Sequence, residues 1–426
     1  MKQQIDRIRG WATSATAKDT YILFAGNVIS AFFAFLFTLF VSRGLSVSEF
    51  GIFSAASNLI VIISSLSDLG ISSGIVNFVA RYLAKGRRET SEKYIKAAFL
   101  LKFVITFILV VLIGVFAPFV SKFLLATGEV KIAYWVAGIS IGTFLWGFFP
   151  NILQAQKRFL ASIVVDLSFA IPRGILGFAL LLIGVLTLDN ALLAFFVSFV
   201  LVVVVGFKLV GTSFLRTRPN KKIYMDVLKF SGWLGVNRFI SGISGRLDIQ
   251  MLAVLVGATS TGLYSIPARL ASFVVVLVSS FSAVLAPRLA AFDDREKEKT
   301  YIAKAVLASL AVVVGVVFWI IIAKPFILIL FGEKYLEAVP IFQALTASMI
   351  PFILTIPSVT AIIYSMKKPI YIGVFSFFQL AAIFVLNLVF IPRYGVFGPT
   401  LTFAITNTIL AIYTWAIVVN HYWIRK

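Results

Sequence analysis

The sequence predicts an all-α membrane protein that crosses the bilayer many times. Of its 426 residues, 60% are apolar and 13% are charged, and the mean hydropathy is +1.02. Apolar stretches of about 20 residues, the length that spans the hydrocarbon core as a helix, recur along the chain. The second half also repeats the first at a nearly constant offset. These observations predict a polytopic protein with about 12 transmembrane helices in two six-helix lobes around a central cavity.

The expected helices follow from apolar stretches that are separated by polar or glycine-containing connectors. They lie at approximately 20–41, 50–79, 95–117, 132–153, 160–184, 190–211, 230–256, 262–287, 302–323, 340–365, 370–391 and 396–420. The first stretch is too long for the apolar core of an ordinary signal peptide. The second is long enough to extend beyond the bilayer as one helix.

Polar segments set the expected domain boundaries. Residues 1–19 form an N-terminal segment, and residues 20–212 form the first lobe with six helices. The linker 213–229 contains a basic cluster with Pro219, which is typical of a solvated connector. Residues 230–426 form the second lobe, also with six helices.

Basic residues predict the orientation of the chain in the membrane. The N-terminal segment, the loops after the even-numbered helices and the C-terminal tail hold 26 of the 38 Lys and Arg residues. The opposite loops hold 6, and another 6 lie within the helices. Because cytoplasmic loops are enriched in Lys and Arg, both termini are expected in the cytoplasm, with the protein in the cytoplasmic membrane. The net charge of +21 then requires no nucleic-acid partner.

The internal repeat aligns residues of the two halves one by one. With an offset of 211 residues, NVISAFF from Asn27 aligns with RFISGIS from Arg238, and GIFSAASN from Gly51 aligns with GLYSIPAR from Gly262. An even number of helices per half predicts a parallel repeat, because both halves then enter from the same side. The repeat pairs Asn58 with Arg269, so the second half carries charge where the first carries amides.

Enzymatic chemistry is not expected. The chain has no cysteine, and its single histidine, His421, lies in the polar C-terminal tail. It contains neither the glycine-rich phosphate loop of ATPases nor the HExxH pattern of zinc proteases. The sequence therefore predicts neither an enzyme nor a protein with a metal or a cofactor.

The stretch 230–269 carries the main functional signal, because Arg238, Arg246, Asp248 and Arg269 lie at expected membrane depth. A charge at the centre of a membrane helix costs roughly 2.5–3.5 kcal/mol, so these side chains should face a cavity or partners within the bundle. One interpretation is a set of ion pairs that holds the bundle together. The other, which we favour, is a cavity lining that binds an anionic substrate.

Acidic residues in the first half suggest two further roles. Asp68 lies on a polar face of the second expected helix. Helix packing explains the serines of this face but not a carboxylate. Asp166 and Arg173 are seven residues apart and therefore share one helix face, which predicts a structural ion pair.

The sequence resembles the polysaccharide-exporter proteins of the multidrug/oligosaccharidyl-lipid/polysaccharide superfamily. The pattern is carried by Arg43-Gly44-Leu45, by Phe50-Gly51-Ile52-Phe53-Ser54, by Asp68-Leu69-Gly70 and by the segment Arg246–Leu270. The resemblance implies two six-helix lobes that form a V around a cavity. It also implies a flippase that moves an oligosaccharide on a polyprenyl (pyro)phosphate across the membrane, opening alternately to each side.

On this hypothesis, Arg238, Arg246 and Arg269 bind the substrate phosphate, and Asn27 and Asn58 contribute from the opposite lobe. Asp68 or Asp248 balances charge or carries a coupling proton or Na⁺. The expected partners are a lipid-linked anionic oligosaccharide and membrane lipid. Two alternatives stay open: a cation-coupled multidrug exporter of the same fold, which should have an acidic or aromatic cavity, and a non-transporting scaffold for glycan synthesis.

Overall fold

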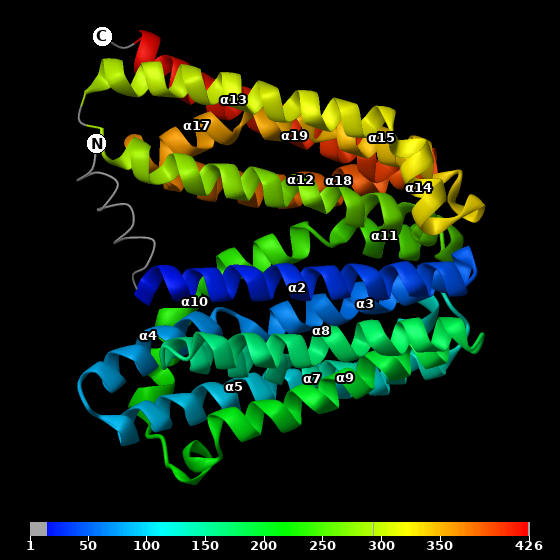
Figure 1. Cartoon of the computed structure of the whole chain (residues 1–426), viewed down its shortest axis with the longest axis vertical. Helices are drawn as coiled ribbons and strands as arrows, with labels where there is room; N and C mark the ends of the chain where they lie inside the picture. Colours follow the sequence, from blue (N-terminus) through cyan, green and yellow to red (C-terminus); the bar gives the residue numbers. More distant parts are fainter. Residues whose placement is uncertain (1–14, 293, 425–426) are drawn as a thin grey trace. The chain divides into compact units, whose positions relative to one another are not determined.

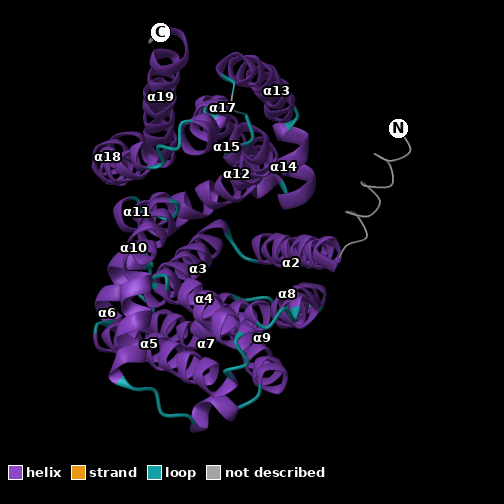
Figure 2. Cartoon of the chain, turned by 90° about the vertical axis from the view of Figure 1, so that its left-hand side faces the viewer, coloured by secondary structure: helices purple, strands orange, loops and turns teal. Residues whose placement is uncertain are grey.

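The computed structural model describes residues 15–292 and 294–424, and within these ranges every regular element is a helix (Figures 1 and 2). The described chain divides into two compact units. Unit 1 holds the residues up to Ser46 together with 56–122 and 127–242. Unit 2 holds 47–55, 123–126 and the residues from Ile243 onward. The predicted lobes, 20–212 and 230–426, are expected to move as rigid bodies. Their boundaries stay a prediction.

Unit 1 is built from long helices that pack side by side. Its helices are α2 (Ala15–Gly44), most of α3 (Val47–Asp68), α4 (Ile71–Ala84), α5 (Arg88–Val115), α6 (Ala117–Phe119), α7 (Val130–Ala155), α8 (Phe159–Leu182), α9 (Leu188–Val210) and α10 (Lys221–Ser244). The helices α2 and α8 run alongside each other over most of their length (Figure 1). Small residues permit this approach, because a side chain on Gly174 or Gly177 would collide with Phe33 or Phe37.

Unit 2 mixes long helices with shorter pieces. Its helices are the first two turns of α3, then α11 (Leu247–Leu255), α12 (Ala258–Ala290), α13 (Arg295–Ile321), α14 (Ala323–Phe331), α15 (Ala338–Ser348), α16 (Ile350–Leu354), α17 (Ile356–Thr360), α18 (Ile370–Tyr394) and α19 (Gly398–Val419). Its core contains Val274, Leu289, Ile353, Ile362 and Val418, which are all buried.

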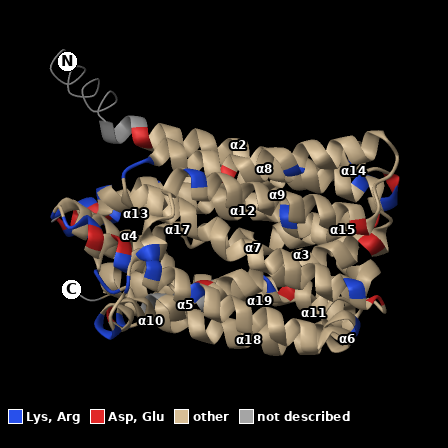
Figure 3. Ribbon diagram, turned by 90° about the horizontal axis from the view of Figure 1, so that it is seen from below, with Lys and Arg blue, Asp and Glu red and all other residues tan. Residues whose placement is uncertain are grey.

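The membrane-protein prediction is confirmed. In the described part of the chain, ten helical segments are long and apolar enough to cross a membrane, and the last of them, 370–424, contains both α18 and α19. Large apolar side chains such as Phe24, Leu182 and Ile329 remain exposed on the helices, as expected for surfaces that face lipid. Charged residues gather mainly toward helix ends, and the intervening lengths carry few of them (Figure 3).

The second expected helix, 50–79, is not continuous. It breaks between α3 and α4, where Leu69 and Gly70 both have positive φ angles of 37° and 79°. Glycine tolerates this left-handed conformation, and its missing side chain also allows the backbone to approach α10. A Cβ on Gly70 would lie 2.7 Å from the backbone nitrogen of Gly235. The break therefore turns the chain against α10.

The seventh and tenth expected helices are also interrupted. The span 230–256 consists of α10 and α11, with a break at Gly245 and Arg246. The span 340–365 consists of α15, α16, α17 and a π-helical turn, η4 (Ala361–Ser365), with Pro351 and Pro357 near the starts of the two short helices. Proline removes a backbone donor and clashes with the preceding turn, which explains the breaks within 340–365.

A reciprocal glycine contact relates the starts of α3 and α12 within unit 2. A Cβ on Gly51 would lie 1.8 Å from the carbonyl oxygen of Ala258, and a Cβ on Gly262 would lie 2.1 Å from the carbonyl oxygen of Val47. Gly51 is repeat-equivalent to Gly262, and Val47 to Ala258, since 262 − 51 and 258 − 47 are each 211. Repeat-equivalent residues thus pack against each other backbone to backbone.

Candidate functional site

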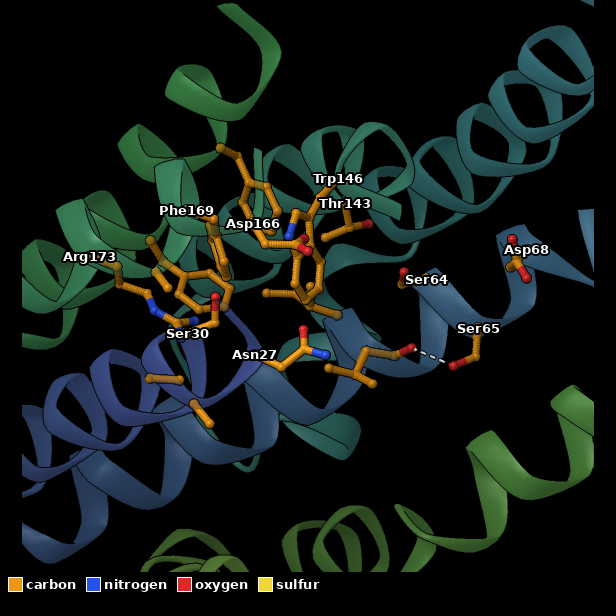
Figure 4. Close-up of a pocket in the computed structure, with 17 residues that line it drawn as sticks. Asn27, Ser30, Ser64, Ser65, Asp68, Thr143, Trp146, Asp166, Phe169 and Arg173 are labelled. Carbon is orange, nitrogen blue, oxygen red and sulfur yellow. Dashed lines mark hydrogen bonds between the residues drawn. The ribbon is translucent and has the colours of Figure 1, made fainter. Parts of the chain in front are cut away.

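A cavity of about 730 Å³ lies inside unit 1 (Figure 4). Five helices enclose it, namely α2, α3, α7, α8 and α9. The side chains that line it are Asn27, Ser30, Ala31, Ala34, Ile60, Val61, Ser64, Ser65, Asp68, Thr143, Trp146, Asp166, Phe169, Ala170, Arg173, Phe195 and Phe199. Its volume lies within the range of pockets that hold small molecules. The predicted site residues Asn27 and Asp68 both belong to this lining.

Aromatic rings form one wall of the cavity. The ring of Trp146 lies 5.1 Å from that of Phe169, whose ring in turn lies 4.4 Å from that of Phe199. Arg173 is 9% exposed, and its guanidinium carbon lies 4.4 Å from the centre of the Phe169 ring and 5.0 Å from that of Phe195. The electron-rich ring faces stabilise this buried cation.

The predicted ion pair between Asp166 and Arg173 is wrong. Asp166 belongs to none of the ion pairs among the described residues, and it lies beside the buried indole N–H of Trp146 (Figure 4). The reason is distance along α8, because seven residues correspond to a rise of about 10 Å. The two side chains share a face of α8 but interact with different neighbours.

Asp68 lies at the α3–α4 break and is held by two partners. The ammonium of Lys102 on α5 donates to its carboxylate at 2.9 Å and to the hydroxyl of Ser72 at 3.1 Å. The backbone N–H of Ser72 donates to the same carboxylate at 3.2 Å, and the Ser72 hydroxyl also bonds to it. The side chains of Lys102 and Asp68 are 3% and 16% exposed. Asp68 therefore accepts a hydrogen bond from the first turn of α4 and neutralises a buried cation.

A second group of charged residues lies in unit 2. Asp248, on α11, is 5% exposed and accepts a hydrogen bond of 2.9 Å from the hydroxyl of Tyr264 on α12. Arg246 immediately precedes α11, and its charge attracts that of Asp248 and repels that of Arg269 on α12. The structure thus brings three of the predicted residues, Arg246, Asp248 and Arg269, into one electrostatic cluster.

The remaining predicted residues have other surroundings. Asn58, on α3, is 2% exposed and does not belong to the cavity-lining residues. The backbone of Arg238 belongs to α10, but its side chain lies outside the described residues.

Sequence reasoning missed Lys102, Trp146 and Tyr264. The lysine contacts a carboxylate 34 residues earlier in the chain, and no local pattern marks such a pairing. The tryptophan is one aromatic residue in a chain with 43 Phe, 13 Tyr and 7 Trp, so its type alone carries no signal. Tyr264 could have been found, because it belongs to the GLYSIPAR segment of the internal repeat.

Comparison with known proteins identifies the family. Residues 16–293 match the family model described as polysaccharide biosynthesis protein. The chain is 24% identical over 282 residues to the probable flippase AglR of Haloferax volcanii, covering 66% of this chain and 56% of that protein. It is 22% identical over 408 residues to the uncharacterized membrane protein MJ1068 of Methanocaldococcus jannaschii, covering 88% of this chain and 78% of that protein.

Solved structures agree on the fold. The lipid II flippase MurJ in an inward closed conformation has a TM-score of 0.73 at 16% identity, covering 94% of this chain and 87% of MurJ. An inward-facing multidrug resistance transporter of the MATE family has a TM-score of 0.68 at 16% identity, covering 91% and 94%. The chain belongs to the polysaccharide biosynthesis protein family and has the fold of the multidrug/oligosaccharidyl-lipid/polysaccharide transporter superfamily.

Proposed function

We propose that the protein is a flippase for an anionic, lipid-linked oligosaccharide in the cytoplasmic membrane. The substrate would carry its glycan on a polyprenyl phosphate or pyrophosphate and would cross by alternating access. Membership of the polysaccharide biosynthesis family and similarity to a probable flippase support a glycan-related substrate. The fold supports transport, because flippases and multidrug transporters share it.

The observation that carries the anionic part of this proposal is a pair of arginines on two helices of unit 2 that pack against each other, Arg246 at the start of α11 and Arg269 on α12. Two like charges in a bundle of apolar helices repel each other, and this repulsion falls when a phosphate binds to both. Guanidinium groups suit the task because they stay charged and bind phosphate oxygens with paired N–H donors. Arg238, Asn27 and Asn58 stay, in this proposal, the further phosphate-binding residues that the sequence predicts.

The carboxylate of Asp248 would couple transport to the binding of a proton or Na⁺. It lies beside Arg246 and Tyr264, so a proton or Na⁺ bound there would alter the field that the phosphate experiences. Asp68 would act as the corresponding charge balance in unit 1 through its ion pair with Lys102. Both termini would lie in the cytoplasm, as the distribution of basic residues predicts.

The test compares Arg246→Gln and Arg269→Gln with the corresponding Arg→Lys variants in vesicles that contain a labelled polyprenyl-diphosphate saccharide. Each charge-assisted hydrogen bond contributes roughly 1.5–3 kcal/mol, so each Gln variant should weaken binding about ten- to a hundredfold. The Lys variants should recover part of this loss because they keep the charge. Arg288→Gln is the matched control, because Arg288 lies on the same helix, α12, and is exposed.

The same vesicles distinguish the alternative of a multidrug exporter. That function predicts export of an organic cation such as tetraphenylphosphonium, and the MATE-like fold favours testing it. Unchanged flipping in both Gln variants, at normal membrane levels, would show that these arginines do not bind substrate. Cation export that is insensitive to both substitutions would then support the exporter.

A further inference from the structure

The cavity in unit 1 combines an aromatic wall with uncharged polar groups. Trp146, Phe169, Phe195 and Phe199 supply the rings, as described above. The amide of Asn27 and the hydroxyl groups of Ser30, Thr143 and Ser64 surround the same space, together with the carboxylate of Asp166 (Figure 4). Pockets with apolar walls and a few placed polar groups are typical of small-molecule sites.

Two buried polar atoms of the lining point to a ligand. The hydroxyl oxygen of Ser30 and the indole nitrogen of Trp146 are both inaccessible, and neither makes a hydrogen bond of good geometry within the described residues, although the indole N–H lies beside the carboxylate of Asp166. A buried donor without an acceptor is costly, so such groups are normally paired with protein, water or ligand. Ser30 and Trp146 lie on different helices, α2 and α7, and both border the cavity.

Charge argues against an organic cation as the ligand. Asp68 and Asp166 are the acidic residues of the lining, but Asp68 is paired with Lys102, and Arg173 adds a second positive charge. Counting Lys102, two negative and two positive charges cancel. The faces of Phe169 and Phe195 already hold the guanidinium of Arg173, so the protein itself supplies the cation for these rings.

We propose that this cavity binds an uncharged sugar residue of the transported glycan. A pyranose has an apolar C–H face, which fits a ring such as that of Trp146, and a rim of hydroxyl groups that each donate and accept. Asp166 would accept from one or two sugar hydroxyl groups, while Asn27, Ser30 and the indole N–H of Trp146 would complete the rim. The identification of this sugar as cargo rests on the proposed flippase function, whereas its binding does not.

Direct binding of free saccharides tests the proposal without any transport. Purified protein is titrated with a panel of hexoses, N-acetylhexosamines and their short oligomers, followed by calorimetry and saturation-transfer NMR. At least one saccharide should bind to the wild type. One neutral hydrogen bond corresponds to a change of about three- to tenfold, so Trp146→Phe and Ser30→Ala should each weaken binding by that factor. Asp166→Asn should weaken it about tenfold or more, because hydrogen bonds to a charged acceptor are stronger.

Control substitutions lie outside the cavity on α7 and α8, two of the helices that line it. Trp135→Phe alters a second tryptophan of α7, whose indole donates to Asp189, and Ser168→Ala alters a serine of α8 that donates to the carbonyl of Val165. Neither residue lines the cavity, so both variants should bind saccharide as the wild type does. Equal losses in control and cavity variants would overturn the assignment.

Two further outcomes would also overturn it. One is a wild type that binds no saccharide of the panel. The other is tetraphenylphosphonium binding that Asp166→Asn abolishes while saccharide binding is unaffected by all three cavity variants. These outcomes are separate from the flippase test. If no saccharide binds but the Arg246→Gln and Arg269→Gln variants flip poorly, only the sugar site is lost. If saccharides bind but both variants flip normally, only the phosphate site is lost.

Discussion

The charged residues within the helices have different surroundings in the two units. In unit 1, Lys102 and Asp68 neutralise each other at 2.9 Å, and Arg173 lies over aromatic rings. In unit 2, Arg246 and Arg269 are close enough to repel each other, with Asp248 as the nearby acid. A buried ion pair is costly to break because one charge is then left without its partner, whereas like charges held together favour a bound anion. On the proposed function, the charges of unit 1 are structural and the arginines of unit 2 bind the substrate.

The two units differ in charge at positions that the internal repeat makes equivalent. Asn58 occupies the position in the first half that Arg269 occupies in the second, and the two lie at repeat-equivalent sites of α3 and α12. A buried amide can pack without a counter-ion, whereas a guanidinium in the same setting requires an acid, a ring or a bound anion. Duplicated helices can therefore keep their packing while one copy acquires a binding role.

The largest effect is expected from breaking the ion pair of unit 1. Asp68→Asn leaves the ammonium of Lys102 buried without its carboxylate, and such a change typically costs about 3–5 kcal/mol. The loss should appear as a lower free energy of unfolding or a lower melting temperature of the detergent-solubilised protein.

A double-mutant cycle provides the control for this effect. Asp68→Asn combined with Lys102→Met removes both charges, so it should recover most of the stability that either single change loses. If Asp68→Asn retains wild-type stability and abolishes flipping instead, the carboxylate is part of the transport machinery. The contrast between the two units would then disappear.

A smaller effect is expected at the glycine contact that relates the two halves. Gly262→Ala places a Cβ against the carbonyl oxygen of Val47, and forcing extra atoms into a packed contact typically costs about 1–3 kcal/mol. Gly51→Ala should cost a similar amount because the contact is reciprocal. Thermal unfolding of the purified variants measures both values.

Gly315→Ala is the matched control for the glycine variants. Gly315 lies inside α13, and an added Cβ would meet no atom within 4 Å. This change should be neutral or stabilise the protein by up to about 1 kcal/mol through helix propensity. Equal behaviour of Gly262→Ala and Gly315→Ala would contradict a tight backbone contact between the repeats.

The smallest effect is expected from Arg173→Gln. The change removes a cation that lies over three aromatic rings, which should lower stability by about 0.5–2 kcal/mol. Arg269→Gln, by contrast, should reduce flipping more than stability. Melting curves and flipping rates of the two variants, measured in parallel, sharpen the comparison between units. Strong loss of flipping with unchanged stability in Arg173→Gln would place this arginine with the substrate-binding group.

Composition and periodicity were sufficient for the membrane-spanning helices, because about 20 apolar residues have few alternatives to a transmembrane helix. Composition and periodicity did not predict the breaks within these helices. Leu69 and Gly70 stand in a stretch of serine, glycine and apolar residues that is compatible with a continuous helix, and the break depends on close packing against Gly235, far away in sequence. Positive φ angles arise from such tertiary contacts, which a local pattern does not contain.

The candidate sites were predicted unevenly for a similar reason. Charges such as Asp248 and Arg269 stand out against apolar neighbours, so the sequence indicated the group in unit 2. The unit 1 cavity was indicated only through Asn27 and Asp68, because Trp146 and Phe169 are of residue types that also fill cores. The seven-residue spacing of Asp166 and Arg173 was misleading, since a shared helix face does not place two side chains in contact.

The glycine contact also constrains the order in which the chain can fold during synthesis. The first two turns of α3 pack in unit 2, where Gly51 meets Gly262, while the rest of the same helix packs in unit 1. The ribosome must add 211 residues after Gly51 before its partner exists. At about 5–20 residues per second, this takes roughly 10–40 s. During this interval the start of α3 lacks its native neighbour, which only the second half of the chain supplies.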